Sequence, residues 1–106
     1  MVTVGILDHD RLDGASNYVI WKARLSFIID EFGLRTYIGV VVEIPTDADQ
    51  LKEYIKDMAQ VKQLILDGVW DHVVSHIAGK DSSKKMWDSL AMLYHGIFKQ
   101  RKMYLE

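Results

Sequence analysis

Apolar residues recur at helical spacing in the first third of the chain. In a helix these residues would share one face. They are Tyr18, Trp21, Leu25, Ile28 and Phe32. Ser16 or Asn17 can cap the start of this helix, so it is expected to cover about residues 17–32. Gly33 stands where helices often end in a left-handed residue, and Leu34 can fold back on the last turn.

The middle of the chain predicts a loop followed by a long helix. Residues 35–46 are rich in β-branched side chains and are interrupted by Gly39 and Pro45, so they are expected to form an extended loop. Asp47 or Asp49 can cap the next helix. Its inner face is expected to comprise Leu51, Ile55, Met58, Val61 and Ile65. The pair Asp67-Gly68 would then interrupt it.

Two shorter helices are predicted after this interruption. The first lies near 69–78 and ends before Gly79, with its apolar face made by Val69, Trp70, Val73, Val74 and Ile77. The second opens at Asp81-Ser82-Ser83 and has Gly96 as its candidate end. Its inward residues are expected to be Trp87, Leu90, Leu93 and Tyr94.

The two ends of the chain complete the prediction. Residues 1–15 hold no long periodic pattern and are interpreted as an extended lead-in, whereas 97–106 read as the start of a truncated or exchanged helix. The chain of 106 residues is therefore predicted to be one all-α domain, a compact bundle of about five helices.

Composition narrows the possible functions. Hydrophobic residues make up 49% of the chain, charged residues 26%, and the net charge is −2, so no overall positive field favours nucleic acid or anionic lipid. Cysteine is absent, which excludes disulfides and thiolate zinc sites and favours a reducing compartment, with the cytoplasm as the default. No apolar run approaches the roughly 18 residues of a membrane-spanning helix, and no targeting signal is expected.

Two motif blocks resemble a known family. The first contains Leu12, Gly14, Asn17-Tyr18 and Trp21, and Arg24 and Gly33-Leu34 follow it. The second runs from Ser82 to Leu90 with Trp87 inside it, and Leu93 and Tyr94 follow. In this order the two blocks are similar to the N-terminal part of the Gag polyprotein of copia-type LTR retrotransposons.

Three departures from the family pattern stand out. One extra residue lies between Gly14 and Asn17, Tyr54 stands where the family often has Trp, and Lys85 replaces the usual Glu. That Glu would close a capping box with Ser82, so its replacement removes a local contact.

The resemblance implies a fold similar to the N-terminal domain of retroviral capsid proteins. The implied task is self-association of Gag into virus-like particles that enclose the element's RNA, without a catalytic residue, cofactor or small-molecule substrate. The implied partner is a second copy of the chain, in a homodimer or higher oligomer. A host-domesticated Gag-like adaptor that binds a protein or peptide remains the alternative.

Few residues suggest chemistry. His72 and His76 have the i, i+4 spacing of a zinc pair, but no third ligand is identifiable, so no metal is predicted. Tyr18, Trp21, Trp87 and Tyr94 could stack on RNA bases, although each falls on an apolar helix face and is better interpreted as core.

Two sets of residues are candidates for contacts with partners. Basic side chains gather in the second half, and weak RNA contact is assigned to Lys99, Arg101 and Lys102, with Lys80, Lys84 and Lys85 nearby. RNA binding could also depend on a downstream region. Phe98, Met103 and Leu105 are the candidates for self-association.

Overall fold

The structure is a computed structural model that describes residue 6 and residues 8–95. Within these residues it is all-α, as predicted, with five α-helices: α1 (Tyr18–Glu31), α2 (Thr36–Gly39), α3 (Ala48–Asp67), α4 (Asp71–Ile77) and α5 (Ser83–Leu90). Short turns of 3-10 helix cover Asp8–Asp10 and Ala15–Asn17, and a π-helical turn, Ala91–His95, follows α5. None of the described helices is long and apolar enough to cross a membrane.

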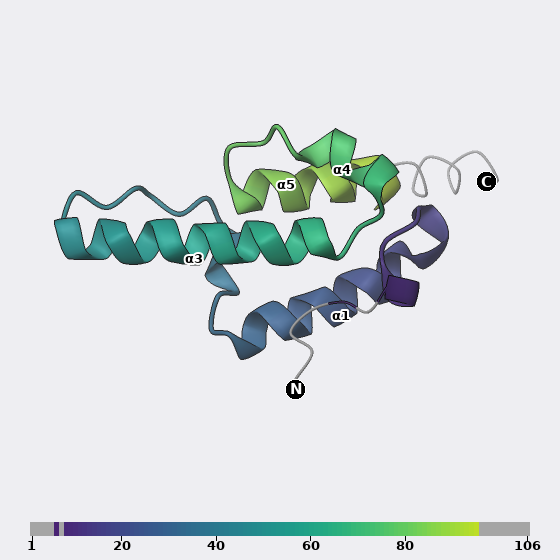
Figure 1. The fold of residues 1–106 in the computed structure, drawn as a ribbon, viewed down its shortest axis with the longest axis horizontal. Helices are drawn as coiled ribbons and strands as arrows, with labels where there is room; N and C mark the ends of the chain where they lie inside the picture. Colours follow the sequence, from purple (N-terminus) through teal and green to yellow (C-terminus); the bar gives the residue numbers. More distant parts are fainter. Residues whose placement is uncertain (1–5, 7, 96–106) are drawn as a thin grey trace, which may run out of the picture.

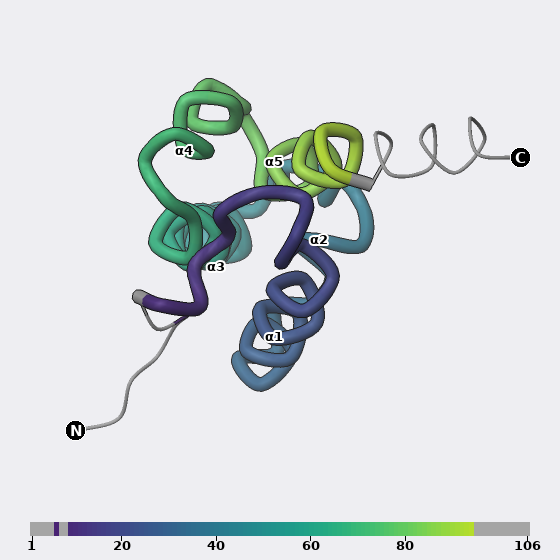
Figure 2. The backbone as a smooth tube through the Cα atoms, turned by 90° about the vertical axis from the view of Figure 1, so that its right-hand side faces the viewer, coloured from purple at the N-terminus to yellow at the C-terminus, as the bar shows by residue number. Residues whose placement is uncertain are grey.

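The long helix α3 lies in the middle of the molecule. Figure 1 shows α1 on one side of it, and α4 with α5 on the other. Figure 2 shows that the lead-in crosses near one end of α3 before it reaches α1. One hydrophobic core joins these elements, with fully buried side chains such as Leu12, Leu25, Ile65, Ile77 and Leu90.

The end of α1 confirms the predicted stop. Gly33 has a φ of 73°, and its N–H donates to the carbonyl of Asp30 at 2.9 Å. The N–H of Leu34 donates to the carbonyl of Ile29 at 3.1 Å, and the Leu34 side chain is buried. These two bonds form a Schellman motif, in which a left-handed glycine lets the chain reverse.

The segment after Leu34 corrects one prediction. Residues 36–39 form the helical turn α2 rather than an extended loop. The N–H of Tyr37 donates to the carbonyl of Leu34, and the N–H of Ile38 donates to the carbonyl of Arg35. The Ile38 side chain is buried in the core. Burial of Ile38 therefore outweighs the β-propensity of its neighbours. Residues 41–45 have no regular secondary structure, as expected.

Helix α3 begins as predicted, and the C-terminal part of its predicted inner face is buried, with Met58, Val61 and Ile65 in the core. The carboxylate of Asp47 accepts a hydrogen bond from the backbone N–H of Gln50 at 3.0 Å, which caps the helix. Ile55, predicted to be inward, is 59% exposed, whereas Leu64 is buried. The reason is visible in Figure 1, where the first half of α3 extends beyond the other helices. Periodicity finds an apolar face, but only the packing decides how much of it is covered.

The two C-terminal helices lie in the predicted segments, although Trp70, predicted on the apolar face of the first, precedes α4 and is 38% exposed. α4 begins after the predicted interruption at Gly68, and α5 is capped by Ser82, whose hydroxyl accepts from the N–H of Lys85 at 3.2 Å. Lys85 also pairs with Asp81 at 3.0 Å. Trp87 and Leu90 are buried, whereas Tyr94 is half-buried. Gly96 and the expected helix at 97–106 lie outside the described residues.

Candidate functional site

The two motif blocks meet in the core. Trp21 of α1 and Trp87 of α5 are 1% and 8% exposed, and their ring centroids lie 5.7 Å apart. Tyr18 stands 6.1 Å from Trp21 and 5.8 Å from Tyr94, so four aromatic rings form a continuous group. The core interpretation of these aromatic residues is therefore confirmed for Tyr18, Trp21 and Trp87. Tyr94 packs against the core and is half-buried.

The carbonyl oxygen of Gly68 links this aromatic group to the lead-in. It accepts a hydrogen bond from Trp21 Nε1 at 2.7 Å and another from the N–H of Leu12 at 2.9 Å. The N–H of Trp70 donates to the carbonyl of Leu12, which completes an isolated parallel bridge between Leu12 and Val69. A side chain on Gly68 would meet Trp21 Nε1 at 3.3 Å and the carbonyl oxygen of Leu64 at 3.2 Å. Sequence reasoning treated Gly68 only as a helix interruption and missed this junction.

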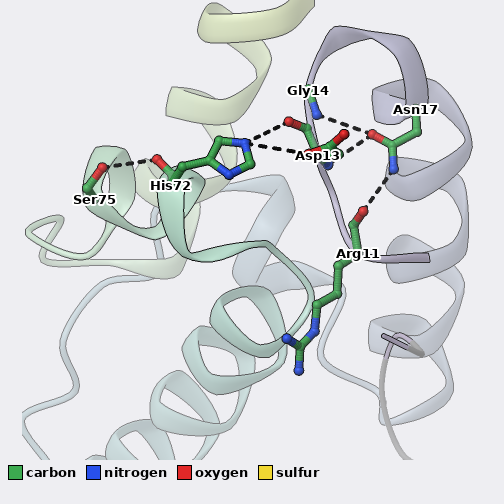
Figure 3. A network of polar contacts seen from close by, with 6 residues as sticks. All are labelled: Arg11, Asp13, Gly14, Asn17, His72 and Ser75. Carbon is green, nitrogen blue, oxygen red and sulfur yellow. Dashed lines mark hydrogen bonds and ion pairs between the residues drawn. The ribbon is translucent and has the colours of Figure 1, made fainter. Parts of the chain in front are cut away.

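Asn17 has a different role from the predicted one. It precedes α1 but its side chain makes no capping bond to that helix. Figure 3 shows that the side chain points back into the lead-in, where Oδ1 accepts from the N–H groups of Asp13 at 3.1 Å and Gly14 at 3.3 Å. Its Nδ2 donates to the carbonyl of Arg11 at 2.8 Å. The Asn17 amide therefore holds the turn at 11–17. Asn17 occupies the predicted N-cap position, but its side chain bonds to the turn and makes no capping bond to α1.

His72 connects α4 to the same turn. Its Nε2 lies 2.8 Å from the carbonyl oxygen of Asp13 and therefore donates to it, since a carbonyl only accepts (Figure 3). The Asp13 carboxylate is also near, at 3.7 Å. Among the described residues, no group of three or more His, Asp or Glu side chains could hold a metal ion. The structure therefore pairs His72 with Asp13 and offers no ligand set around His76.

Two of the basic residues in the second half of the chain, Lys84 and Lys85, pair with acidic side chains. Lys84 Nζ lies 2.6 Å from Asp88 on α5, and Lys62 Nζ donates to the carbonyl of Asp81 at 3.0 Å. The hydrogen bond from Lys85 holds the pKa of the Asp81 carboxyl below its usual range, with the charge of Lys85 as a second cause. The RNA candidates Lys99, Arg101 and Lys102 lie outside the described residues, as do the self-association candidates Phe98, Met103 and Leu105.

Two apolar surfaces are exposed among the described residues, and the sequence interpretation missed both. The first, the outer α1 face, comprises Val19, Ile20, Ala23 and Phe27. The second, the α3 end surface, comprises Val40, Val41, Ile44 and Ile55. Sequence reasoning counted one apolar face on α1, yet the spacing of Ile20, Ala23 and Phe27 already signals a second face.

Both surfaces are candidate interaction sites because their large apolar side chains are exposed to water, and on the outer α1 face these side chains share one side of the helix. Single exposed apolar residues are ordinary, whereas contiguous groups mark contacts with partners. Comparison of the chain with protein-family models, with characterised proteins and with solved structures gives no match.

Proposed function

We propose that the chain is a structural, non-enzymatic domain of the copia-type Gag class, whose task is self-association into a retrotransposon particle. One observation supports the proposal above the others. The two motif blocks, distant in the sequence, contact each other through Trp21 and Trp87. The motif residues therefore build the core, and the function would lie in the exposed surfaces. A domain that forms particles binds its partners through such surfaces.

The exposed apolar faces support the same proposal. A capsid-type domain needs several weak contacts that repeat in geometry, because many weak contacts together produce a stable assembly. The outer α1 face and the α3 end surface belong to different segments of the chain, and each presents apolar side chains to solvent. The proposed partner is a second copy of the chain, with RNA bound weakly or through a downstream region. The cytoplasm is the compartment that we propose.

Sedimentation velocity over a concentration series tests this function. We expect a reversible monomer–dimer equilibrium or larger species up to high micromolar concentration. The association should change little between low and moderate salt, since burial of apolar surface depends weakly on ionic strength. A strictly monomeric protein at every concentration would contradict the proposal and favour a Gag-like adaptor that binds a protein or peptide.

A further inference from the structure

Helix α1 is apolar on two opposite sides. Its buried side carries Tyr18, Trp21, Leu25 and Ile29. On the other side, Val19 is 71% exposed, Ile20 60% and Phe27 65%. A surface helix normally turns polar residues toward water, and a helix that is apolar all round is usually covered all round. The outer side of α1 is therefore left uncovered by residue 6 and residues 8–95, which the structure describes.

The exposed residues form one stripe. With 3.6 residues per turn, positions 20, 23 and 27 fall above one another, and Val19 lies beside them. Ala23, in the middle, is the smallest of the four. A stripe with a small central residue and larger residues above and below allows another helix to approach closely at the centre.

We propose that the outer α1 face binds the same face of a second copy of this chain, with the two α1 helices antiparallel about a two-fold axis near Ala23. This inference rests on the proposed function and names the surface that begins the assembly. Symmetric contacts of this kind are the commonest between identical chains. The antiparallel arrangement places Phe27 of each copy opposite Ile20 of the other.

Charge supports the antiparallel orientation. The last turn of α1 contains Asp30 and Glu31 but no basic residue, and the first turn contains no acidic residue. Carboxylates near a helix C-terminus oppose the helix dipole, so this distribution is unfavourable for α1 alone. In the antiparallel pair, Asp30 and Glu31 come close to the N-terminus of the second α1, where a negative charge is favourable. A parallel pair would bring the four carboxylates together.

The size of the contact determines its strength. Helix α1 has 14 residues, and such a helix spans about 20 Å. One face of it offers less than the roughly 800 Å² per partner of a standard interface. The dimer should therefore be weak and in rapid exchange. A weak contact suits particle assembly, because many weak contacts made at once hold the assembly together with high avidity.

The first test compares two substitutions of exposed apolar residues by sedimentation velocity. Phe27→Glu puts a charge into the proposed contact, opposite Ile20 of the second copy, and should weaken dimerisation by about tenfold or more, because the charge would be desolvated without a partner. Met92→Glu puts the same charge on an apolar residue that is 78% exposed and lies outside both apolar surfaces, so it should leave dimerisation unchanged. Both positions are largely exposed, so both variants should keep the parent's helical circular dichroism and melting temperature.

The second test uses the absence of cysteine in the sequence. In the variant Ala23→Cys, the new thiols of two copies face each other near the axis, and mild oxidation should produce a disulfide-linked dimer in high yield. Ala59→Cys, at an exposed alanine in the middle of α3, is the matched control and should stay mostly monomeric.

The outcomes separate this inference from the proposed function. A parent protein that dimerises, together with an unaffected Phe27→Glu variant or equal cross-linking at positions 23 and 59, would overturn the α1 contact alone. Loss of dimerisation in a third variant, Ile55→Glu, with Phe27→Glu unaffected, would move the dimer contact to the α3 end surface. A parent that remains monomeric would overturn both the inference and the self-association on which it rests.

Discussion

Trp21 combines a large apolar ring with one polar atom, and the fold uses both. The ring lies between Tyr18 and Trp87, and Nε1 donates to the carbonyl of Gly68. A buried tryptophan N–H needs such an acceptor, because an unsatisfied buried donor costs about 1–3 kcal/mol. Trp21 therefore ties α1 at once to α5 and to the junction after α3.

Replacement of a core tryptophan should be severely destabilising. We expect Trp21→Ala and Trp87→Ala each to lower the free energy of unfolding by about 3–5 kcal/mol, because each leaves a large cavity. Urea denaturation at low protein concentration would measure this change. Phe27→Ala, an exposed aromatic on the same helix, is the control and should stay within about 0.5 kcal/mol of the parent. Tryptophan variants that melt within a few degrees of the parent would disprove their place in the core.

Gly68 should tolerate no side chain. In Gly68→Ala, the new methyl group would lie 3.2–3.3 Å from Ile6, Leu64 and Trp21, so these groups must shift. We expect a loss of about 1–3 kcal/mol in unfolding free energy, which is typical of overpacking. Gly79→Ala provides the control, since no atom lies within 4 Å of the added methyl group. Equal stability of the two variants would argue against the close approach of Trp21 to Gly68.

The buried tyrosines predict weakness in alkali. Burial raises the pKa of Tyr18 above its ordinary value, with Asp88 as a second cause, and burial also raises the pKa of Tyr94. Above about pH 10, tyrosines of the unfolded chain lose protons that the folded chain retains. The contribution of these tyrosines to the free energy of unfolding is therefore fully present below this pH, and it is lost as the pH rises toward the folded pKa. Tyr18→Phe should make this fall shallower in urea titrations at several alkaline pH values, and parallel curves for parent and variant would contradict the assignment.

At the scale of elements, α3 divides into two halves with different support. Its second half carries Met58, Val61, Leu64 and Ile65 into the core, whereas Ile55 in the first half is 59% exposed. Local stability follows the density of buried contacts. The first half therefore depends on the Asp47 cap more than on packing.

Removal of that cap should act locally. In Asp47→Ala the N–H of Gln50 loses its carboxylate acceptor, at a cost of about 1 kcal/mol to this end of the helix. Hydrogen exchange should show faster exchange for amides near residues 50–55, with those of 61–66 unchanged. Ser75→Ala, which removes an exposed hydroxyl on α4, is the control. Uniformly faster exchange along α3 would mean that the helix unfolds as one unit.

At the scale of the whole molecule, the core alone should maintain the fold. The chain has no cysteine, and the part of it that the structure describes offers no group of metal ligands. We therefore expect EDTA to leave the melting temperature unchanged, since a metal that bound only the folded state would raise it. Added zinc should likewise have no effect at low concentrations. A clear fall in melting temperature with EDTA would show that His72 and His76 bind metal after all.

Local signals in the sequence determined most of the elements. Gly33 ends α1, Asp47 begins α3 and Ser82 begins α5, because caps and left-handed glycines act within one turn of the chain. Helical spacing also identified Trp21 and Trp87 as core residues, since an apolar stripe must find cover.

Only the tertiary structure decided which apolar faces are covered. Ile55 and Phe27 satisfy the helical pattern as well as their buried neighbours do. Yet α3 extends beyond the other described helices, and none of these helices covers the outer side of α1. The side chain of Asn17 and the carbonyl of Gly68 find partners in the turn and bridge of the lead-in, through bonds that helical periodicity does not encode. The sequence by itself determines which surfaces are apolar, and the packing of distant segments determines which of them remain free to bind another molecule.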